Sequence, residues 1–478
     1  MASAARVSKR REMLLHRFFH TFLLTNFADE FLMQKAARRI VERLRKRGHE
    51  AFFAGGWVRD HLLKRRAKDI DIATSALPEQ VQRIFPNSIP IGASFGVVQV
   101  RHYGHAYEVT TFRKEGPYLD GRHPSEVTFT GPAQDALRRD FTINGLFYDP
   151  IAERVIDYVH GKQDLQHKVI RTIGDPHDRF EEDKLRMLRA VRFACSLDFE
   201  IDPPTWDIIR QSAPRILQVS WERIRDEIVK MLTGPARGRA LDLLRESGLL
   251  AEILPEVEAM RGIEQPPEYH PEGDVFTHTR LALDLLHRPS PVLALGTLLH
   301  DVGKPPTFSV RERIRFDGHV ELGAQMADSI CRRLRLSNED TEQIVALAQH
   351  HLRFMHVYEM RKSTLTRFLR LPHFEDHLEL HRVDCLSSHG TLETYHFCAE
   401  KLKELQAQVP PAPPLINGQE LIGLGYPPGP IFGEILTAVE DLQIEEALKT
   451  REEALEYVRE TFPLTGAGKG EENERSRN

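Results

Sequence analysis

Residues 51–75 read AFFAGGWVRDHLLKRRAKDIDIATS, and this stretch decides the fold of the N-terminal part of the chain. Asp69 and Asp71 are spaced i, i+2, so in a β-strand both carboxylates project from one face. Ile70 and Ile72 then point to the other face, where a core can bury them. Two like charges this close repel each other unless cations lie between them. An isolated pair of this kind also fits a solvated surface strand, so the interpretation depends on the neighbouring residues.

The turn before this strand supports a functional site. Gly55 and Gly56 precede Val58-Arg59-Asp60. Because glycines lack a side chain, a phosphate can approach their backbone N–H groups closely. A guanidinium can bind a phosphate through two hydrogen bonds. Strand acids beside a phosphate loop predict Mg²⁺-dependent nucleotidyl or phosphoryl transfer.

Length and composition indicate the number of domains and the class of protein. The 478 residues are too many for one ordinary core, which favours two to four domains. Hydrophobic residues make up 41% and charged residues 28%, and the formal net charge is −5, as in a soluble globular protein. No apolar run approaches the roughly 20 residues of a membrane helix. The four scattered cysteines (Cys195, Cys331, Cys385, Cys398) predict reduced thiols and a cytoplasmic location.

The chain changes character along its length. Apolar spacing predicts a helix over 34–47, and strands are expected at 51–56, 96–103 and 106–113, within an α+β domain. From residue 175 onward the patterns are nearly all helical. The basic N-terminus fits a peripheral helix better than a targeting peptide, and Pro410-Pro-Ala-Pro-Pro predicts a stiff linker. The expected domains are an N-terminal helical extension (1–48), a head (49–172), a helical neck (173–265), a histidine-rich domain (266–405), a helical tail (406–465) and a disordered end (466–478).

Glu108 is the best candidate for a third acid. It lies in YEVTTFR, a strand that can pair beside Asp69 and Asp71. Three carboxylates could hold metal ions that activate a 3′-hydroxyl and neutralise a triphosphate. An exposed strand acid is an equally good interpretation of Glu108 alone. In RRDFTING, Arg139 could contact a triphosphate, while Asp140 and Asn144 favour a scaffold role through capping or turn hydrogen bonds.

The segment EDKLRMLRAVRF (182–193) predicts one continuous helix. At 3.6 residues per turn, its polar residues form a slanting stripe and its apolar residues face inward. An Asp–Arg pair three residues apart serves ordinary helix stability, but it can also read the polar edges of bases. The polar stripe consists of Asp183, Arg186, Arg189 and Arg192. The buried side consists of Leu185, Leu188 and Val191.

These motifs, in this order, resemble those of the bacterial class II tRNA nucleotidyltransferase and poly(A) polymerase family. The resemblance rests on GGWVRDHLLKRRAKDIDIAT, EVTTFR, RRDFTINGLFYDP and EEDKLRMLRAVRFA and covers about residues 50–400. It implies a polymerase-β-like head, helical neck, body and tail domains, and repair of tRNA 3′-CCA ends with CTP and ATP.

The resemblance also implies residue roles. Asp69 and Asp71 would hold Mg²⁺, with Glu108 as the auxiliary acid. Asp183 and Arg186 would form the amino-acid template that selects CTP and ATP. The remaining nucleotide-binding positions are Gly55, Gly56, Arg59, Arg139, Arg189 and Arg192.

Two further segments bear on the reaction. The turn-rich segment at 115–124 matches the family's flexible loop and favours an enzyme that can add A. Gly92-Ala-Ser-Phe95 departs from the basic pair typical of bacterial poly(A) polymerases, which weakens that alternative without excluding it.

A second pattern follows between residues 270 and 384. Imidazoles and carboxylates together suit Mn²⁺, Fe²⁺, Ni²⁺ or Zn²⁺. The pattern resembles the HD phosphohydrolase domain, which makes a metal-dependent phosphohydrolase acting on RNA ends the alternative function. Lys304 could meet a phosphate oxygen or remain solvated. The matching ligands are His278, His300, Asp301 and Asp384, and His319 and His350 match extra positions of dinuclear members.

Overall fold

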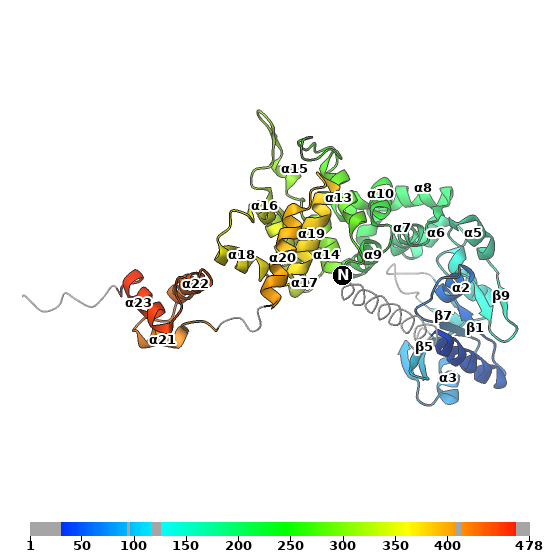
Figure 1. Cartoon of the computed structure of the whole chain (residues 1–478). Helices are drawn as coiled ribbons and strands as arrows, with labels where there is room; N and C mark the ends of the chain where they lie inside the picture. Colours follow the sequence, from blue (N-terminus) through cyan, green and yellow to red (C-terminus); the bar gives the residue numbers. More distant parts are fainter. Residues whose placement is uncertain (1–29, 93–95, 117–125, 408–412, 465–478) are drawn as a thin grey trace, which may run out of the picture. The chain divides into compact units, whose positions relative to one another are not determined.

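The computed structural model describes residues 30–92, 96–116, 126–407 and 413–464 (Figure 1). The chain divides into two compact units between Pro255 and Glu256. The N-terminal segment 1–29, most of the predicted flexible loop (117–125), most of the 92–95 motif (93–95), most of the linker (408–412) and the end of the chain (465–478) lie outside the described residues. Within the described ranges, no helix is long and apolar enough to cross a membrane.

The first unit begins with a helix over residues 30–46 and continues as a mixed α/β domain. Its strands are β1 (Ala51–Ala54), β2 (Asp71–Thr74), β3 (Ile89–Gly92), β4 (Val97–His102), β5 (His105–Thr111), β6 (Arg113–Glu115), β7 (Val127–Phe129), β8 (Phe147–Asp149), β9 (Arg154–Ile156), β10 (Val169–Ile170) and β11 (Glu200–Ile201). Its helices are α2 (Gly56–Leu62), α3 (Pro78–Ile84), α4 (Pro132–Leu137), η2 (Thr142–Asn144), α5 (Gly161–His167), α6 (Pro176–Glu182), α7 (Leu185–Leu197), α8 (Pro203–Ser212), η3 (Ala213–Gln218), α9 (Trp221–Leu232), α10 (Arg237–Glu246) and α11 (Leu249–Ile253).

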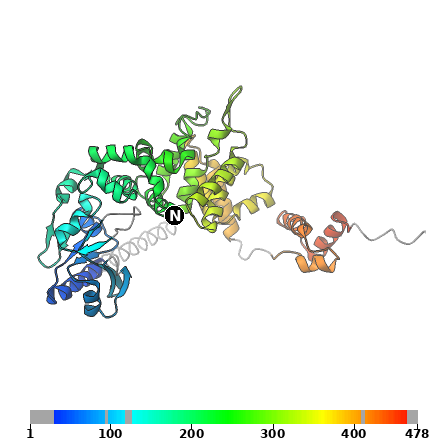
Figure 2. The same cartoon turned by 180° about the vertical axis from the view of Figure 1, so that it is seen from behind.

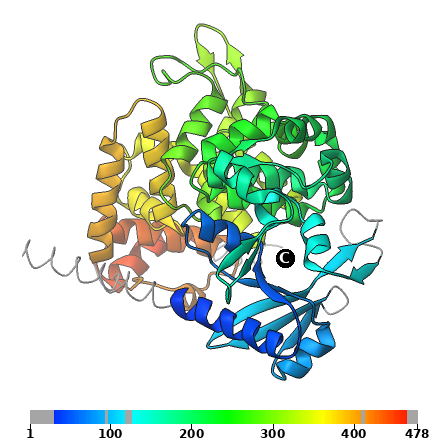
Figure 3. The same ribbon diagram turned by 90° about the vertical axis from the view of Figure 1, so that its right-hand side faces the viewer.

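Seven strands form the main sheet, in the order β3-β4-β5-β2-β1-β8-β9. β2 pairs antiparallel with β1 and parallel with β5, so the predicted strand of Asp71 lies in the middle of the sheet. Figure 3 shows these blue and cyan strands with the helix of residues 30–46 beside them. Phe52, Phe112 and Phe147 pack together in the core, with ring centroids 5.9–6.2 Å apart.

After the sheet the first unit is mostly helical, as predicted, but the expectation of a single helix over 182–193 is wrong. α6 ends at Glu182 and α7 begins at Leu185. Asp183 between them has extended backbone (φ −150°, ψ 104°), and its Oδ1 accepts a hydrogen bond from the N–H of Leu185. The side chain thus satisfies a backbone donor at the start of α7, which is the competition that favours aspartate at helix ends.

In its described residues, the second unit is helical apart from one small hairpin. It begins with α12 (Pro255–Glu258) and contains α13 (Val275–Leu285), α14 (Pro291–Leu299), α15 (Lys304–Thr307), β12 (Ser309–Val310), β13 (Ile314–Arg315), α16 (His319–Arg333), α17 (Asn338–His350), η4 (His351–His356), α18 (Lys362–Leu369), α19 (Phe374–Ser387), α20 (Glu393–Ala407), α21 (Gly418–Gly423), α22 (Pro430–Ile444) and α23 (Arg451–Thr461). α13 packs on α19, and α17 packs on both α14 and α16 (Figures 1 and 2).

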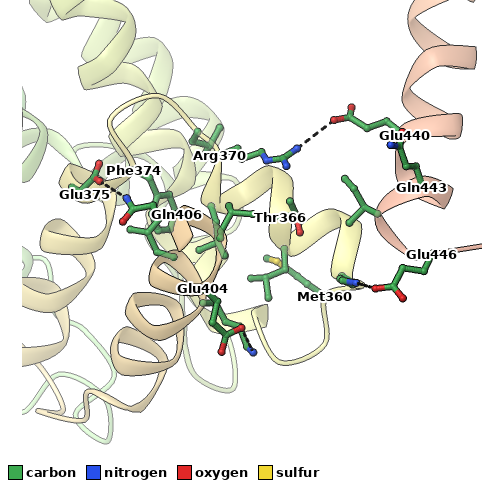
Figure 4. A pocket seen from close by; sticks show the side chains of 18 of the residues that line it. Met360, Thr366, Arg370, Phe374, Glu375, Glu404, Gln406, Glu440, Gln443 and Glu446 are labelled. Atoms are coloured by element: carbon green, nitrogen blue, oxygen red, sulfur yellow. Dashed lines mark hydrogen bonds and ion pairs between the residues drawn. The ribbon is translucent and has the colours of Figure 1, made fainter. Parts of the chain in front are cut away.

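The last three helices have a small core of their own around Ile435 and Val458. An open cavity of about 880 Å³ lies where α18 and α20 face α22 (Figure 4). Ion pairs cross it, with Lys362 Nζ 2.6 Å from Glu446 and Arg370 Nη1 3.5 Å from Glu440. Because both charges of each exposed pair are matched, we regard this cavity as a junction between helices.

Candidate functional sites

The strand acids lie where the central strand β2 begins, next to the glycine turn. Asp71 is the first residue of β2 and pairs with Ala54, the residue before Gly55. The pairing of Ile72 with Val109 places Glu108 on the neighbouring strand at the level of Asp71. β5 therefore pairs beside the strand acid as predicted.

Asp69 precedes β2, so the expectation that both acids lie within the strand is wrong for this residue. The alternation nevertheless extends back to it. Ile70 and Ile72 are buried, while Asp69 and Asp71 remain exposed. The core takes the two isoleucines, and the two acids face solvent.

The acids interact unfavourably with one another. Asp71 is exposed to solvent at the surface, yet many protein atoms surround its carboxyl. This burial, with the negative charges of Asp69 and Glu108, raises its pKa to about 6, while Arg139 opposes the rise. A divalent cation among these oxygens would remove the repulsion, and carboxylate oxygens are ligands that suit Mg²⁺.

The glycine turn and Arg139 are closely packed. Gly55 has φ +67°, a conformation that favours glycine, and caps α2. A Cβ at Gly55 would lie 3.0 Å from Arg139 Nη1, so a side chain there would crowd the guanidinium. Buried Asp135 holds Arg139 with a separation of 3.0 Å and Arg138 with 2.8 Å.

Asp140 and Asn144 link arginines from two elements. Asn144 Oδ1 accepts a hydrogen bond from Arg59 Nη1 at 2.8 Å, and its amide donates to Asp140 Oδ1 at 3.0 Å. Arg189 Nε donates to Asp140 Oδ2 at 2.9 Å. Despite burial, Arg189 and Asn144 hold the pKa of Asp140 well below its ordinary value. Both residues therefore position arginines, in line with the predicted scaffold role.

α7 carries its buried side as predicted, with Leu185, Leu188 and Val191 in the core. The two residues of the expected template do not pair with each other. Asp183 Oδ2 accepts a hydrogen bond from Arg223 on α9 at 2.7 Å. Arg186 Nη1 lies 2.5 Å from Glu182 and donates to the carbonyl of Arg179 at 2.9 Å. Each is thus fixed by a different neighbour.

Arg192 also has a partner that the sequence did not indicate. Its Nε donates to Glu227 Oε2 on α9 at 2.5 Å, and Glu227 is almost fully buried. The guanidinium groups of Arg59, Arg189 and Arg192 lie 4.0–5.4 Å from the ring centre of Phe193. These contacts bring together arginines that are distant in the sequence. Arg223 and Glu227 carried no local signal, whereas Asp135 and Arg139 are spaced i, i+4, a visible helical pair.

The second site is a buried histidine–carboxylate cluster in the second unit. His278 Nε2 lies 3.0 Å from Asp384 Oδ1, and His300 Nε2 lies 3.2 Å from Asp301 Oδ2. His278 Nε2 is also 3.9 Å from Asp301 Oδ2. His278 lies on α13, Asp384 lies on α19, and His300 and Asp301 directly follow α14, so four predicted ligands from three segments meet at one point.

Two further histidines complete the cluster, one of them not as predicted. His319 Nε2 lies 4.0 Å and His351 Nε2 lies 3.6 Å from Asp301 Oδ1. His350 points elsewhere, with its ring 5.9 Å from that of His377, so the expectation for His350 is wrong. The apolar face of α17, with Ile344 and Ala348, continues to His351 at the helical spacing, and this signal could have identified the right residue.

The chemistry of this cluster fits a transition metal. In each histidine, Nδ1 is held by an acceptor: Glu272, or the carbonyls of Thr297, Phe316 and Ala348. The four Nε2 atoms and Asp301 Oδ1 are buried and make no hydrogen bond of acceptable geometry among the described residues, although each histidine has a carboxylate oxygen within 4.0 Å. An anchored Nδ1 directs the Nε2 lone pair inward, as in metal-binding histidines. The described residues accordingly include overlapping groups that could hold a metal ion.

Charged neighbours surround this centre. The carboxylates of Asp384 and Glu272 outweigh the effect of burial and raise the pKa of His278 to about 9. Lys304 Nζ lies 2.7 Å from Asp301 Oδ2 and donates to Gln265 Oε1 at 2.7 Å. Lys304 is therefore buried and paired, and its predicted solvated alternative is wrong. The sequence did not single out Glu272 or Gln265, because nothing in their spacing marks them.

Three family models match successive parts of the chain. Residues 51–171 match the poly A polymerase head domain, and residues 198–261 match a probable RNA and SrmB-binding site of polymerase A. Residues 269–371 match the HD domain. The head model covers the strand acids with Arg59 and Arg139, whereas Arg189 and Arg192 lie between the first two matched segments. The HD model covers most of the histidine cluster.

Known relatives agree with these matches. The CCA-adding enzyme of Geobacillus stearothermophilus is 47% identical over 215 residues, which are 45% of this chain and 53% of that protein. That of Enterococcus faecalis is 46% identical over 215 residues (45% and 52%). The matched region thus spans about half the length of these curated relatives.

Solved structures extend the likeness beyond that half. The CCA-adding enzyme of Bacillus stearothermophilus in complex with CTP is 30% identical, with a TM-score of 0.68, and the alignment covers 89% of this chain and 98% of that one. The Thermotoga maritima enzyme complexed with tRNA shares the fold at 18% identity, with a TM-score of 0.55 and coverage of 89% and 94%. The resemblance inferred from the motifs is confirmed, and the chain belongs to the family of CCA-adding enzymes.

Proposed function

We propose that this chain is a template-independent nucleotidyltransferase that adds CCA, or its terminal A, to tRNA 3′ ends from CTP and ATP. The observation that carries the proposal is the grouping of Asp71 and Glu108, on neighbouring central strands, beside Gly55 and Arg139. The named complexes of relatives with CTP and with tRNA support the same substrates. Unpaired buried cysteines favour a cytoplasmic location.

Asp69 and Asp71 would hold Mg²⁺, with Glu108 as the auxiliary acid. Bound Mg²⁺ would neutralise triphosphate charge and increase the acidity of the attacking hydroxyl. The 3′-hydroxyl oxygen attacks the α-phosphorus, and pyrophosphate leaves. The raised pKa of Asp71 supports this assignment, because three neighbouring carboxylates repel one another until a cation binds between them.

The nucleotide would lie against the arginine network. We assign Gly55 and Gly56 to close backbone approach and the arginines to phosphate and sugar contacts. Their acidic partners fix the guanidinium positions before the nucleotide arrives, which favours catalysis by positioning. The arginines are Arg59, Arg139, Arg189 and Arg192.

Asp183 and Arg186 would select the base. A carboxylate accepts hydrogen bonds and a guanidinium donates them, so the two can read the edge of cytosine or adenine. Asp183 stands at the break between α6 and α7, where its backbone is extended. Arg223 and Glu182 hold the two side chains separately, so each could be lost without releasing the other.

Three RNAs test the activity: tRNA lacking CCA, tRNA ending in CC, and unstructured RNA, each with CTP, ATP or both. We expect the first to gain CCA and the second to gain A. Long A tails on the unstructured RNA would instead support a poly(A) polymerase. Asp71→Ala should abolish all addition, and retained activity would contradict the metal assignment.

We propose a second, metal-dependent phosphohydrolase site at the histidine cluster. The buried Nε2 atoms without partners favour it over a purely structural role. His278, His300, Asp301 and Asp384 would hold a transition metal, and the bound metal would supply an activated water. His319 and His351 extend the set toward Asp301 Oδ1. The proposed HD domain is residues 266–405, after a head (49–172) and neck (173–265).

Hydrolysis of a 2′,3′-cyclic phosphate tests this second site. We expect the activity to need added Mn²⁺, Ni²⁺, Fe²⁺ or Zn²⁺ and to be lost in His300→Ala and Asp301→Ala. Asp71→Ala should retain it, because that residue belongs to the other compact unit. Loss of metal binding, measured by calorimetry, should accompany the two inactive variants. Equal loss in all three variants would refute a separate site.

A further inference from the structure

The small hairpin of the second unit lies between two residues of the histidine cluster in the sequence, Lys304 and His319. β12 follows Lys304 by five residues, and β13 precedes His319 by four. Lys304 Nζ is 2.7 Å and His319 Nε2 is 4.0 Å from the carboxylate of Asp301. Figure 3 shows the two yellow-green arrows of the hairpin projecting away from the helices. A ligand on the hairpin base would therefore lie next to the cluster.

Aromatic side chains mark the base of the hairpin. Phe308 and Phe316 flank the two strands, with ring centroids 5.9 Å apart and planes inclined by 47°. Phe308 is 37% exposed. Lys304 Nζ lies 5.4 Å from the centre of the Phe316 ring, which links this ring to the cluster. An exposed aromatic beside a cation offers a face on which an unpaired base can stack.

The hairpin is basic although the whole chain has a net charge of −5. Arg311 and Arg313 are exposed in its turn, and Arg315 is on β13, against the single acid Glu312. No guanidinium of these three forms an ion pair within the described ranges. Several other arginines of this unit form ion pairs, as Arg333 does with Glu256 at 2.7 Å. Unpaired guanidiniums beside an aromatic pair suit a single-stranded polyanion that carries bases.

We propose that this hairpin docks the 3′ end of a single-stranded RNA next to the histidine cluster. Arg311 and Arg313 contact backbone phosphates, and Phe308 stacks on a base. Presentation of the terminal phosphate for cleavage rests on the proposed phosphohydrolase, whereas the docking does not. An acidic peptide would use the arginines but gain little from the aromatic pair, so RNA is the better fit.

The test compares two substrates on the full chain with Mn²⁺ or Ni²⁺: a five-nucleotide RNA ending in a 2′,3′-cyclic phosphate, and 2′,3′-cyclic AMP. In Arg311→Ala/Arg313→Ala, kcat/KM for the RNA should fall about tenfold or more and its log–log salt slope by about 1.4, from two lost phosphate contacts. The value for the mononucleotide should stay within twofold. Equal losses on both substrates, or no loss on the RNA, would overturn the proposal.

Two further variants separate docking from damage to the fold. Phe308→Ala should cost at least fivefold on the RNA only, the lower end of the range for a stacked base. Glu312→Gln is the matched control in the same turn, and it should leave RNA cleavage unchanged or improve it. A loss equal to that of the double arginine variant would contradict the charge argument, as would polyglutamate competing as well as RNA.

Crosslinking tests whether RNA binds to the hairpin even if the chain hydrolyses no RNA. RNA carrying 4-thiouridine at its 3′ end is irradiated with the full chain, and the crosslinked peptide is identified by mass spectrometry. A crosslink within residues 308–316 with no hydrolysis would refute the phosphohydrolase but support the docking. Crosslinks confined to other peptides would refute the docking itself.

Discussion

Asp71→Asn should stabilise the metal-free first unit at pH 7.5. The pKa of Asp71 rises from 3.8 to about 6 in the folded chain, because burial and the neighbouring acids oppose its charge. A shift of about 2 units corresponds to about 3 kcal/mol against folding at neutral pH. Since the residue is partly open to solvent, screening reduces this to about 1–2 kcal/mol.

The sign of the effect depends on pH. Below the unfolded pKa both states carry the proton, so the penalty is absent. It grows as pH rises through the interval from 3.8 to about 6 and is complete above it. Removing the charge should therefore raise stability at pH 7.5 and leave it nearly unchanged at pH 3.5. For a unit of this size, each kcal/mol corresponds to about 2–4 °C in melting temperature.

Calorimetry at low salt, with and without Mg²⁺, measures this effect. Mg²⁺ should stabilise the wild type and have little effect on Asp71→Asn, which has lost a ligand. Asp60→Asn is the matched control, because its carboxylate pairs with Arg59 at 2.8 Å, and its loss should lower stability at pH 7.5. If Asp71→Asn is no more stable than the wild type at pH 7.5, or gains as much at pH 3.5, the reasoning about repelling acids is refuted.

Three other changes test the remaining assignments. Asp183→Ala should relax the choice between CTP and ATP by at least tenfold in the ratio of kcat/KM values while Mg²⁺-dependent stabilisation persists; unchanged selectivity would count against the template role. Glu227→Gln leaves Arg192 without its buried charged partner, so the free energy of unfolding of the first unit, measured in urea, should fall by about 3 kcal/mol. His351→Ala should weaken transition-metal binding about tenfold or more by calorimetry, whereas the neighbouring His350→Ala should not; the reverse order would contradict the geometry of the cluster.

Local patterns predicted the elements and much of both sites. The alternation around Asp71 indicated its strand and the burial of Ile70 and Ile72, because period two needs only nearby residues. The break at Asp183 escaped prediction because its cause is a side chain that accepts a hydrogen bond from the backbone N–H of Leu185, two residues further on. Glu227 escaped because its partner is 35 residues away. Sequence spacing reveals faces of an element, whereas charge pairing across elements depends on the tertiary fold.

The acids around the proposed nucleotide site are as informative as its arginines. Each arginine proposed to contact a phosphate or sugar already has a carboxylate or amide partner. The proposed nucleotide site therefore contains little unpaired positive charge. A triphosphate would therefore gain less from bare attraction than from guanidiniums whose rotamers are already fixed, which lowers the entropic cost of ordering them on binding. Arg311 and Arg313 of the hairpin show the opposite arrangement, because they are exposed and form no ion pair within the described residues. This contrast fits a site that must select one nucleotide geometry in the first unit, and a surface that tolerates many RNA sequences in the second.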